Sequence, residues 1–113
     1  MRVVKNIAAQ GDFIIKRIES LPDGLAVAES VDDKYIIAHS ETGHNHTVLE
    51  RSCQLLIDQT NEFIVYLKVD TDAAIIEHER SFDTHEPLEV PAGIYEIRRQ
   101  REYIPEGYRR AQD

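Results

Sequence analysis

The residues best suited to chemistry lie in one twelve-residue stretch, HSETGHNHTVLE, at residues 39–50, which holds three of the chain's five histidines. Side chains two apart along a β-strand point to the same face, roughly 6.5–7 Å from each other along the chain. The pair His44 and His46 can therefore direct two imidazoles at one point. Two or three neutral imidazoles with a carboxylate suit Zn²⁺, Fe²⁺, Ni²⁺ or Mn²⁺ at ligand distances near ~2.1 Å. The spacing thus indicates a transition-metal site, and an open coordination position there would allow catalysis.

The other histidines are candidates for the same site, since they come from neighbouring expected strands and loops: His39, His78 and His85. In the alternative interpretation, all five are core or rim residues, hydrogen-bonded to backbone groups or to carboxylates. The nearest such carboxylates along the chain and across the expected sheet are Glu41, Glu50 and Glu77. In the metal interpretation these carboxylates would instead fix the imidazole tautomers. The sequence leaves both interpretations open and identifies no catalytic residue or substrate.

The elements that must position these side chains are short β-branched runs separated by turn residues. No segment shows an apolar period of 3.6 residues over ten or more positions, so no long helix is expected. The expected strands are 13–18, 25–28, 35–39, 44–49, 53–57, 63–69, 74–78, 88–90 and 94–97, with turns at 32–33, 70–72 and 91–93. This spacing predicts an all-β protein, built as a single small antiparallel β-barrel or β-sandwich.

Length and composition predict one soluble domain. The chain has 113 residues, of which 42% are apolar, enough for one core. We expect a β-domain at residues 1–101 and a short irregular or helical tail at 102–113. No apolar run approaches the ~20 residues that cross a bilayer, and no signal-peptide pattern is present, so a cytoplasmic location without membrane association is expected. The one cysteine, Cys53, lies in an expected strand, which favours a buried thiol over a nucleophile.

The C-terminal segment differs in charge from the rest of the chain. The net charge of −8 argues against nucleic acid as a partner, yet residues 98–113 hold five arginines against three acids. Arginine beside tyrosine suits bidentate hydrogen bonding and stacking on a partner. The expected partner is a second copy of the chain or another protein of an assembly. In the alternative interpretation, the strand that starts at Ile94 is a charge-protected edge strand, and residues 98–113 are a solvated end. The expected partner-binding residues are Arg98, Arg99, Arg101, Tyr103, Arg109 and Arg110.

Two short motifs together resemble the cupin pattern: HxHxxxE at residues 44–50 and PxG at residues 91–93. Cupins are small β-barrels whose first motif supplies two histidines and a glutamate, and whose second contains Pro-x-Gly followed by the last histidine ligand. The resemblance implies a cupin-like barrel with metal ligands at His44, His46 and Glu50. This chain departs from the pattern at Glu96, which stands where the last histidine ligand would be. His78 or His85 would have to replace that ligand.

A longer resemblance covers residues 82–113 together with residues 38–46. These segments contain SExGHxH and PxGxYExRRQREY, and they are similar to small bacterial and phage proteins of unknown function. The resemblance implies no activity, but it does imply that the histidine-rich loop and the tail belong together. Two functions from different classes follow. One is a small cupin-like metal-binding protein; the other is a non-enzymatic structural or interaction protein that binds a partner through its arginine- and tyrosine-rich tail.

Overall fold

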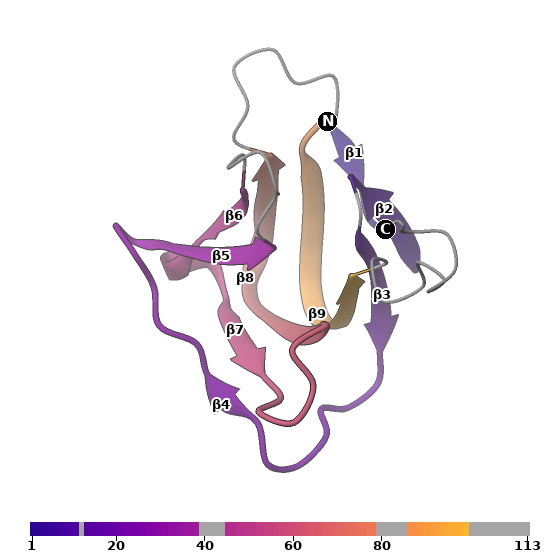
Figure 1. Ribbon diagram of the computed structural model, residues 1–113. Coiled ribbons are helices and arrows are strands. Elements are labelled where there is room, and N and C mark those ends of the chain that lie inside the picture. Colours follow the sequence, from indigo (N-terminus) through magenta and orange to yellow (C-terminus); the bar gives the residue numbers. More distant parts are fainter. Residues whose placement is uncertain (12, 39–44, 79–85, 100–113) are drawn as a thin grey trace, which may run out of the picture.

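The fold is all-β in the part of the chain that the computed structural model describes, residues 1–11, 13–38, 45–78 and 86–99 (Figure 1). The prediction of fold class is therefore confirmed. In these ranges there is no α-helix, and no helix long and apolar enough to cross a membrane. The elements are β1 (Arg2–Val3), β2 (Ile7–Gln10), β3 (Phe13–Ile18), β4 (Ala26–Val27), β5 (Lys34–Ala38), β6 (His46–Leu49), the 3₁₀ turn η1 (Glu50–Ser52), β7 (Gln54–Ile57), β8 (Ile64–His78) and β9 (Leu88–Arg99).

Two long strands, β8 and β9, form the centre of a nine-stranded sheet with the order β2-β3-β9-β8-β6-β5 (Figure 1). Among the described residues, all strand pairings are antiparallel except that of β1, which runs parallel to the start of β9. Each long strand changes its outer neighbour along its length. The first half of β8 pairs with β7 and its end with β6, while β9 pairs first with β1 and then with β3. The β8–β9 ribbon therefore joins two halves of the sheet.

The turns expected at residues 70–72 and 91–93 are wrong, because each segment lies inside a continuous strand. The pairing of β8 with β9 reaches Val69↔Gly93 and resumes at Ala73↔Pro91, so that residues 70–72 of β8 face a single residue of β9. Extra residues in one strand of an antiparallel pair form a bulge, which bends the strands and increases their twist. These turn-forming residues thus bend the ribbon and do not reverse the chain.

The same bulge changes which residues of the ribbon face the core. The buried positions of β8 are odd-numbered up to Val69 on the main-core face and even-numbered from Ala74 onwards. On β9 they change between Val90 and Tyr95. Because strand residues alternate between faces, a regular ribbon would expose the apolar side chains of one half to water. The irregular register keeps the apolar residues of both halves on one core.

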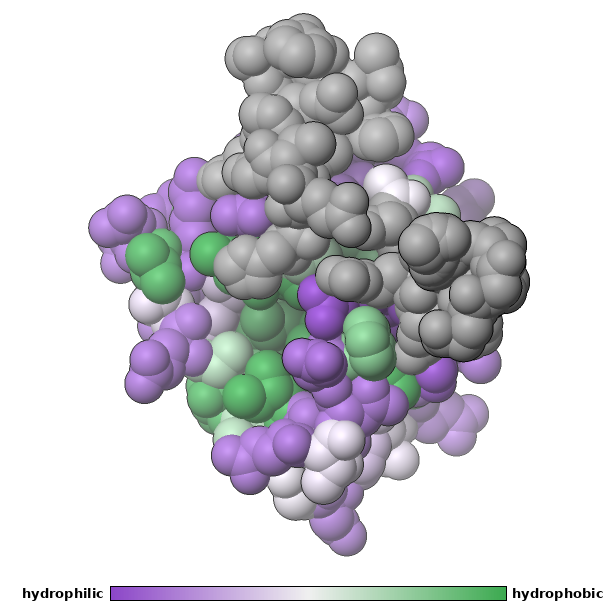
Figure 2. Space-filling view, viewed as in Figure 1, coloured by the Kyte–Doolittle hydropathy of each residue, from purple (hydrophilic) through white to green (hydrophobic). Residues whose placement is uncertain are grey.

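Two apolar clusters hold the sheet together. The smaller one consists of Leu56, Ile64 and Tyr66, with three partly buried residues packed against it. Figure 2 shows apolar residues gathered between β5 and β4, with hydrophilic residues around them. The main core draws on both halves of the sheet: Val4, Phe13, Ile15, Tyr35, Ile37, Ala38, Val48, Cys53, Leu55, Leu67, Val69, Ala74, Ile76, Leu88, Val90, Tyr95 and Ile97.

The side chain of Arg17 in β3 stabilises the bend in β9. We call its hydrogen bonds to Ala92 and Tyr95 the Arg17 clasp. The guanidinium donates to the Ala92 carbonyl oxygen at 3.3 Å and to the Tyr95 hydroxyl at 2.8 Å, and it lies 5.0 Å from the centre of the Tyr95 ring. The Tyr95 hydroxyl in turn donates to the Pro91 carbonyl at 2.8 Å. Gly93 adopts φ +149°, and a Cβ atom there would collide with this guanidinium. The bend is therefore held from a neighbouring strand.

The strand at residues 94–99 lies in the interior of the sheet. It pairs with β3 on one side and with β8 on the other, so the interpretation of this segment as a charge-protected edge strand is wrong. β1 and β2 were not expected, because the short apolar runs near the N-terminus show no clear strand alternation. β2 nevertheless forms one end of the sheet order, and its last residue reaches the candidate site described next.

Candidate functional site

Of the histidines at residues 39–50, the structure describes His46. This residue begins β6 and is 2% exposed. Its Nδ1 atom lies 2.9 Å from Oε1 of Gln10. The ring packs edge-on against Phe13, with ring centres 4.9 Å apart and planes at 82°, a favoured geometry for aromatic pairs. Gln10 and Phe13 pair with each other at the β2–β3 connection. Both residues that flank this connection therefore contact the same imidazole ring.

The hydrogen bonds of Gln10 determine the tautomer of His46. The Gln10 Nε2 atom donates to the carbonyl oxygens of Ile76 at 3.2 Å and Glu86 at 3.1 Å. Carbonyl oxygens only accept hydrogen bonds, so the NH₂ end of the amide faces them and Oε1 faces the ring. Oε1 also only accepts, so Nδ1 of His46 carries the hydrogen. In the neutral ring, Nε2 then holds the lone pair.

Gly11 leaves the space that this ring occupies. Its φ is +60°, and a Cβ atom there would lie 2.8 Å from Cε1 and 2.9 Å from Nε2 of His46. Real Cβ atoms essentially never come so close to a neighbour. Glycine is also the residue that reaches positive φ without strain. Position 11 thus needs glycine both for its backbone conformation and for the ring beside it.

The strand register brings other parts of the predicted site to the same end of the sheet. His46 pairs with Ala38 of β5 on one side and with His78 of β8 on the other. The two amide hydrogen bonds of Gln10 add the backbone at Glu86 to this group. The backbones of His46 and His78, two of the predicted ligands, therefore lie side by side.

The remaining predicted ligands are only partly covered by the structure. Ala38 directly precedes His39, and His85 directly precedes Glu86, so both histidines are bonded to residues at this end of the sheet. The part of the chain that the structure describes includes the backbone of His78 but not its side chain. The residues outside the described ranges are His39, His44 and His85.

Glu50 and Glu77, two of the carboxylates predicted to lie near the histidines, are not beside the His46 ring. Glu50 begins η1 beyond the far end of β6, and its Oε1 accepts a hydrogen bond of 2.9 Å from the Ser30 hydroxyl. It lies four residues from His46, roughly 13 Å along an extended strand. Glu77 pairs with Thr47, and each directly adjoins one of the paired histidines, so both occupy the alternate face of their strands. The His46 Nδ1 atom instead lies against the amide oxygen of Gln10.

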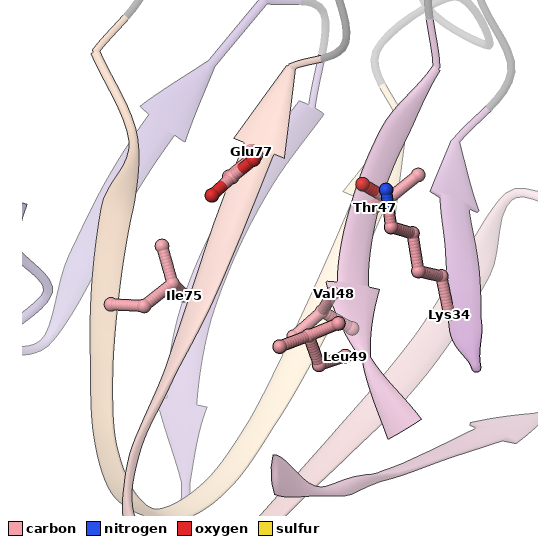
Figure 3. A pocket seen from close by; sticks show the side chains of 6 residues that line it. All are labelled: Lys34, Thr47, Val48, Leu49, Ile75 and Glu77. Atoms are coloured by element: carbon pink, nitrogen blue, oxygen red, sulfur yellow. The ribbon is translucent and has the colours of Figure 1, made fainter. Parts of the chain in front are cut away.

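Glu77 lines a separate hollow of about 270 Å³ over β5, β6 and β8 (Figure 3). In Figure 3 the Lys34 amine lies beside Thr47, and Glu77 projects from the neighbouring strand β8. The hollow combines a cation, a hydroxyl and a carboxylate with an apolar wall, but no histidine is among its described lining residues. The lining residues are Lys34, Thr47, Val48, Leu49, Ile75 and Glu77.

The two described arginines of the predicted partner-binding set contact their own domain. Arg99 donates to the Glu62 carbonyl at 2.9 Å, and its guanidinium lies 5.3 Å from the centre of the Phe63 ring. The Arg98 guanidinium lies 3.7 Å from the Glu96 carboxylate. The Arg99 contacts anchor the end of β9 to the segment before β8, whereas the Arg98–Glu96 pair lies within β9. The other predicted residues lie outside the described ranges: Arg101, Tyr103, Arg109 and Arg110.

Cys53 is a core residue, 4% exposed, between η1 and β7. Burial, and secondarily the charge of Asp70, raise the pKa of its thiol from 9.0 to about 12. The thiol is therefore protonated at neutral pH, whereas nucleophilic attack requires the thiolate. This agrees with the interpretation of Cys53 as a strand-associated, structural residue.

We expect ionisation of Cys53 to lower the free energy of unfolding at alkaline pH. Because its pKa is higher in the folded protein, its contribution is complete below pH 9 and is lost as the pH rises from 9 towards about 12. Urea unfolding of the wild type and Cys53→Ala at pH about 8 and about 10.5 tests this linkage. The wild type should lose more unfolding free energy between the two pH values than the variant. Equal losses would show that the thiol keeps its ordinary pKa.

These features define the class of protein: a small all-β domain with a bent central ribbon and a buried glutamine–histidine pair at one end of its sheet. The pattern of the family described as Domain of unknown function (DUF8820) matches residues 9–100, and the chain belongs to that family. No curated protein and no solved structure gives a significant match. The matched range includes all five histidines and Gln10, and it ends before Arg101. The similarity of the SExGHxH and PxGxYExRRQREY motifs to those of bacterial and phage proteins stays a prediction.

Sequence reasoning missed the residues that organise the site. Gln10 has no local signature, because its partners lie 36, 66 and 76 residues away in the chain. For Gly11 a signal was present: a glycine between Gln10 and the apolar run at 13–18 is typical of a two-residue hairpin connection. The clasp formed by Arg17 was missed as well, since arginine on an expected strand is ordinarily assigned to solvent.

Proposed function

We propose that the protein binds one transition-metal ion at the end of the sheet where β5, β6 and β8 meet. The observation that supports this proposal is the register His46↔His78. Directly opposed residues of antiparallel strands project from the same face, with Cβ atoms about 4.5–5.5 Å apart. Two imidazoles at that separation reach one ion at about 2.1 Å from each nitrogen. His46 and His78 are therefore the proposed pair of ligands.

We propose that further ligands come from the histidines that lie outside the described ranges. Among the described residues, no group of three or more histidine, cysteine, aspartate or glutamate side chains is arranged to hold an ion. The candidates adjoin described backbone at this end of the sheet: His39, His44 and His85. Imidazole ligands suit Zn²⁺, Fe²⁺, Ni²⁺ or Mn²⁺. When bound, such an ion would brace the strand ends or, with an open position, activate a water molecule.

The proposed site differs from the cupin-type ligand set in the role of Glu50. In the cupin resemblance Glu50 is a ligand, whereas its carboxylate here accepts a hydrogen bond from Ser30 beyond the other end of β6. Glu50→Gln keeps the size and the acceptor oxygen of this side chain. It is therefore a matched control that separates the two ligand sets.

Metal binding by tag-free protein tests the proposal, measured by elemental mass spectrometry and by titration with each of the four ions. The wild type should bind about one ion per chain, and His78→Ala should weaken binding by more than the about 10–100-fold expected for loss of an outer-shell partner. Glu50→Gln should bind like the wild type. Circular dichroism of each variant shows whether the fold is kept. A folded His78→Ala variant with wild-type affinity, or a wild type that binds none of the ions, would contradict the proposal.

The alternative function, capture of a protein partner or a second copy through the C-terminal tail, has less support. Arg98 and Arg99 contact their own domain, and the family match ends at residue 100. A variant that ends at residue 101 separates the two functions. It should keep its metal affinity under our proposal, and a change in its oligomeric state without any metal binding would favour the tail instead.

A further inference from the structure

We infer that Gln10 is the positioning residue of this metal site, holding His46 as the Nδ1–H tautomer so that Nε2 is the atom presented to the ion. The inference rests on the proposed function, but the tautomer itself is a property of the metal-free protein. Gln10 does not contact the ion in this scheme; it acts through the ring of His46.

The orientation of the Gln10 amide is set by its surroundings and not by the histidine. Its NH₂ group donates to two backbone carbonyls, those of Ile76 and Glu86. Rotating the amide by half a turn would direct Oε1 at both carbonyls and break both hydrogen bonds. Gln10 is 3% exposed, so water has little access to replace them. Oε1 is therefore held towards Nδ1 of His46, whatever Nε2 contacts.

The ring itself is held from two further sides. Phe13 packs edge-on against it, and the backbone of Gly11 passes so close to Cε1 and Nε2 that a Cβ atom would not fit. The carbonyl of Ile76 belongs to β8, two residues before His78. The amide of Gln10 thus ties the orientation of one proposed ligand to the strand that carries the other.

This arrangement has the form that metal-binding histidines commonly take. One ring nitrogen donates its hydrogen to a fixed acceptor, and the other holds the lone pair that binds the ion. The acceptor is most often a carboxylate, a backbone carbonyl or water. Here a side-chain amide fills that role, and it is uncharged, so it selects the tautomer without adding a negative charge to the buried site.

Two substitutions separate this role from simple packing. Gln10→Met keeps an unbranched side chain of similar length but removes the acceptor, whereas Gln10→Glu keeps an acceptor oxygen and removes the NH₂ group. Gln54→Met, at the exposed first residue of β7, controls for the exchange of glutamine for methionine. Imidazole ¹⁵N–¹H NMR of the metal-free proteins, at a pH where the ring is neutral, reports which nitrogen of His46 carries the hydrogen. Titration with Zn²⁺ reports affinity.

The wild type, Gln10→Glu and Gln54→Met should all show hydrogen on Nδ1, and Gln10→Met should move it towards Nε2. Gln10→Met should also weaken Zn²⁺ binding by about 10–100-fold, and Gln10→Glu should restore most of this loss. Hydrogen on Nε2 in the wild type, or wild-type Zn²⁺ affinity in folded Gln10→Met, would overturn the inference. Hydrogen on Nδ1 in a wild type that binds no ion would overturn the proposed function and leave the tautomer assignment standing.

Discussion

Gly11→Ala is expected to lower the free energy of unfolding by about 2–5 kcal/mol, as the sum of two effects. The left-handed backbone at φ +60° disfavours any residue with a Cβ atom, at a cost of about 1–2 kcal/mol. The new methyl would also overlap the ring of His46, and overpacking of a buried site costs typically about 1–3 kcal/mol. The ring has little freedom to move away, because Gln10 and Phe13 hold it on other sides.

Gly24→Ala is the matched control for this prediction. Gly24 also has positive φ, +81°, but nothing lies within 4 Å of a Cβ atom added there. It should therefore show only the backbone cost of about 1–2 kcal/mol. Urea unfolding followed by circular dichroism measures both variants. Equal losses in Gly11→Ala and Gly24→Ala would mean that the His46 ring does not pack against position 11.

Gly93→Ala is expected to destabilise the protein by about 2–6 kcal/mol through the bend in the central ribbon. A positive φ of +149° is strained for alanine, and such backbone strain costs about 1–3 kcal/mol. The added methyl would also displace the Arg17 guanidinium from the Ala92 carbonyl and the Tyr95 hydroxyl. Each lost hydrogen bond adds about 0.5–1.5 kcal/mol.

A double-mutant cycle with Arg17→Met separates the clasp from the backbone strain. In the Arg17→Met background there is no guanidinium to displace, so Gly93→Ala should cost only its backbone strain. Thermal or urea unfolding of the four proteins gives the interaction energy between the two positions. An equal cost of Gly93→Ala in both backgrounds would contradict the clasp.

The bend and the candidate site are parts of one strand. β8 contains the bulge at residues 70–72, then Ile76, whose carbonyl accepts from Gln10, and finally His78. The irregular register at the bulge sets which face of the following residues is turned to the core. A ribbon without it would turn the Ile76 side chain to the opposite face. The geometry proposed for metal binding therefore depends on the bend.

The amino-acid sequence was sufficient to predict the fold class and the positions of most strands. The run at residues 13–18 became β3 with the same bounds, because a short run rich in Phe and β-branched Ile favours the strand conformation. It also determined the turn at Asp32 and Asp33. Both residues have positive φ, and Val31 and Lys34 exchange backbone hydrogen bonds of 2.8 Å and 3.0 Å across them. These features depend on interactions between residues close in the chain.

The structural role of residues 70–72 and 91–93, in contrast, depends on how two long strands pair. Their local chemistry equally favours reversal of the chain, but pairing of β8 with β9 on both sides of them requires a bend instead. The site divides in the same way. His46 and His78 were proposed as ligands from residue type and strand spacing, whereas their pairing with each other and the hydrogen bonds of Gln10 were not predicted. Gln10 obtains its orientation from carbonyls 66 and 76 residues away, and contacts at such separation exist only once the sheet has formed.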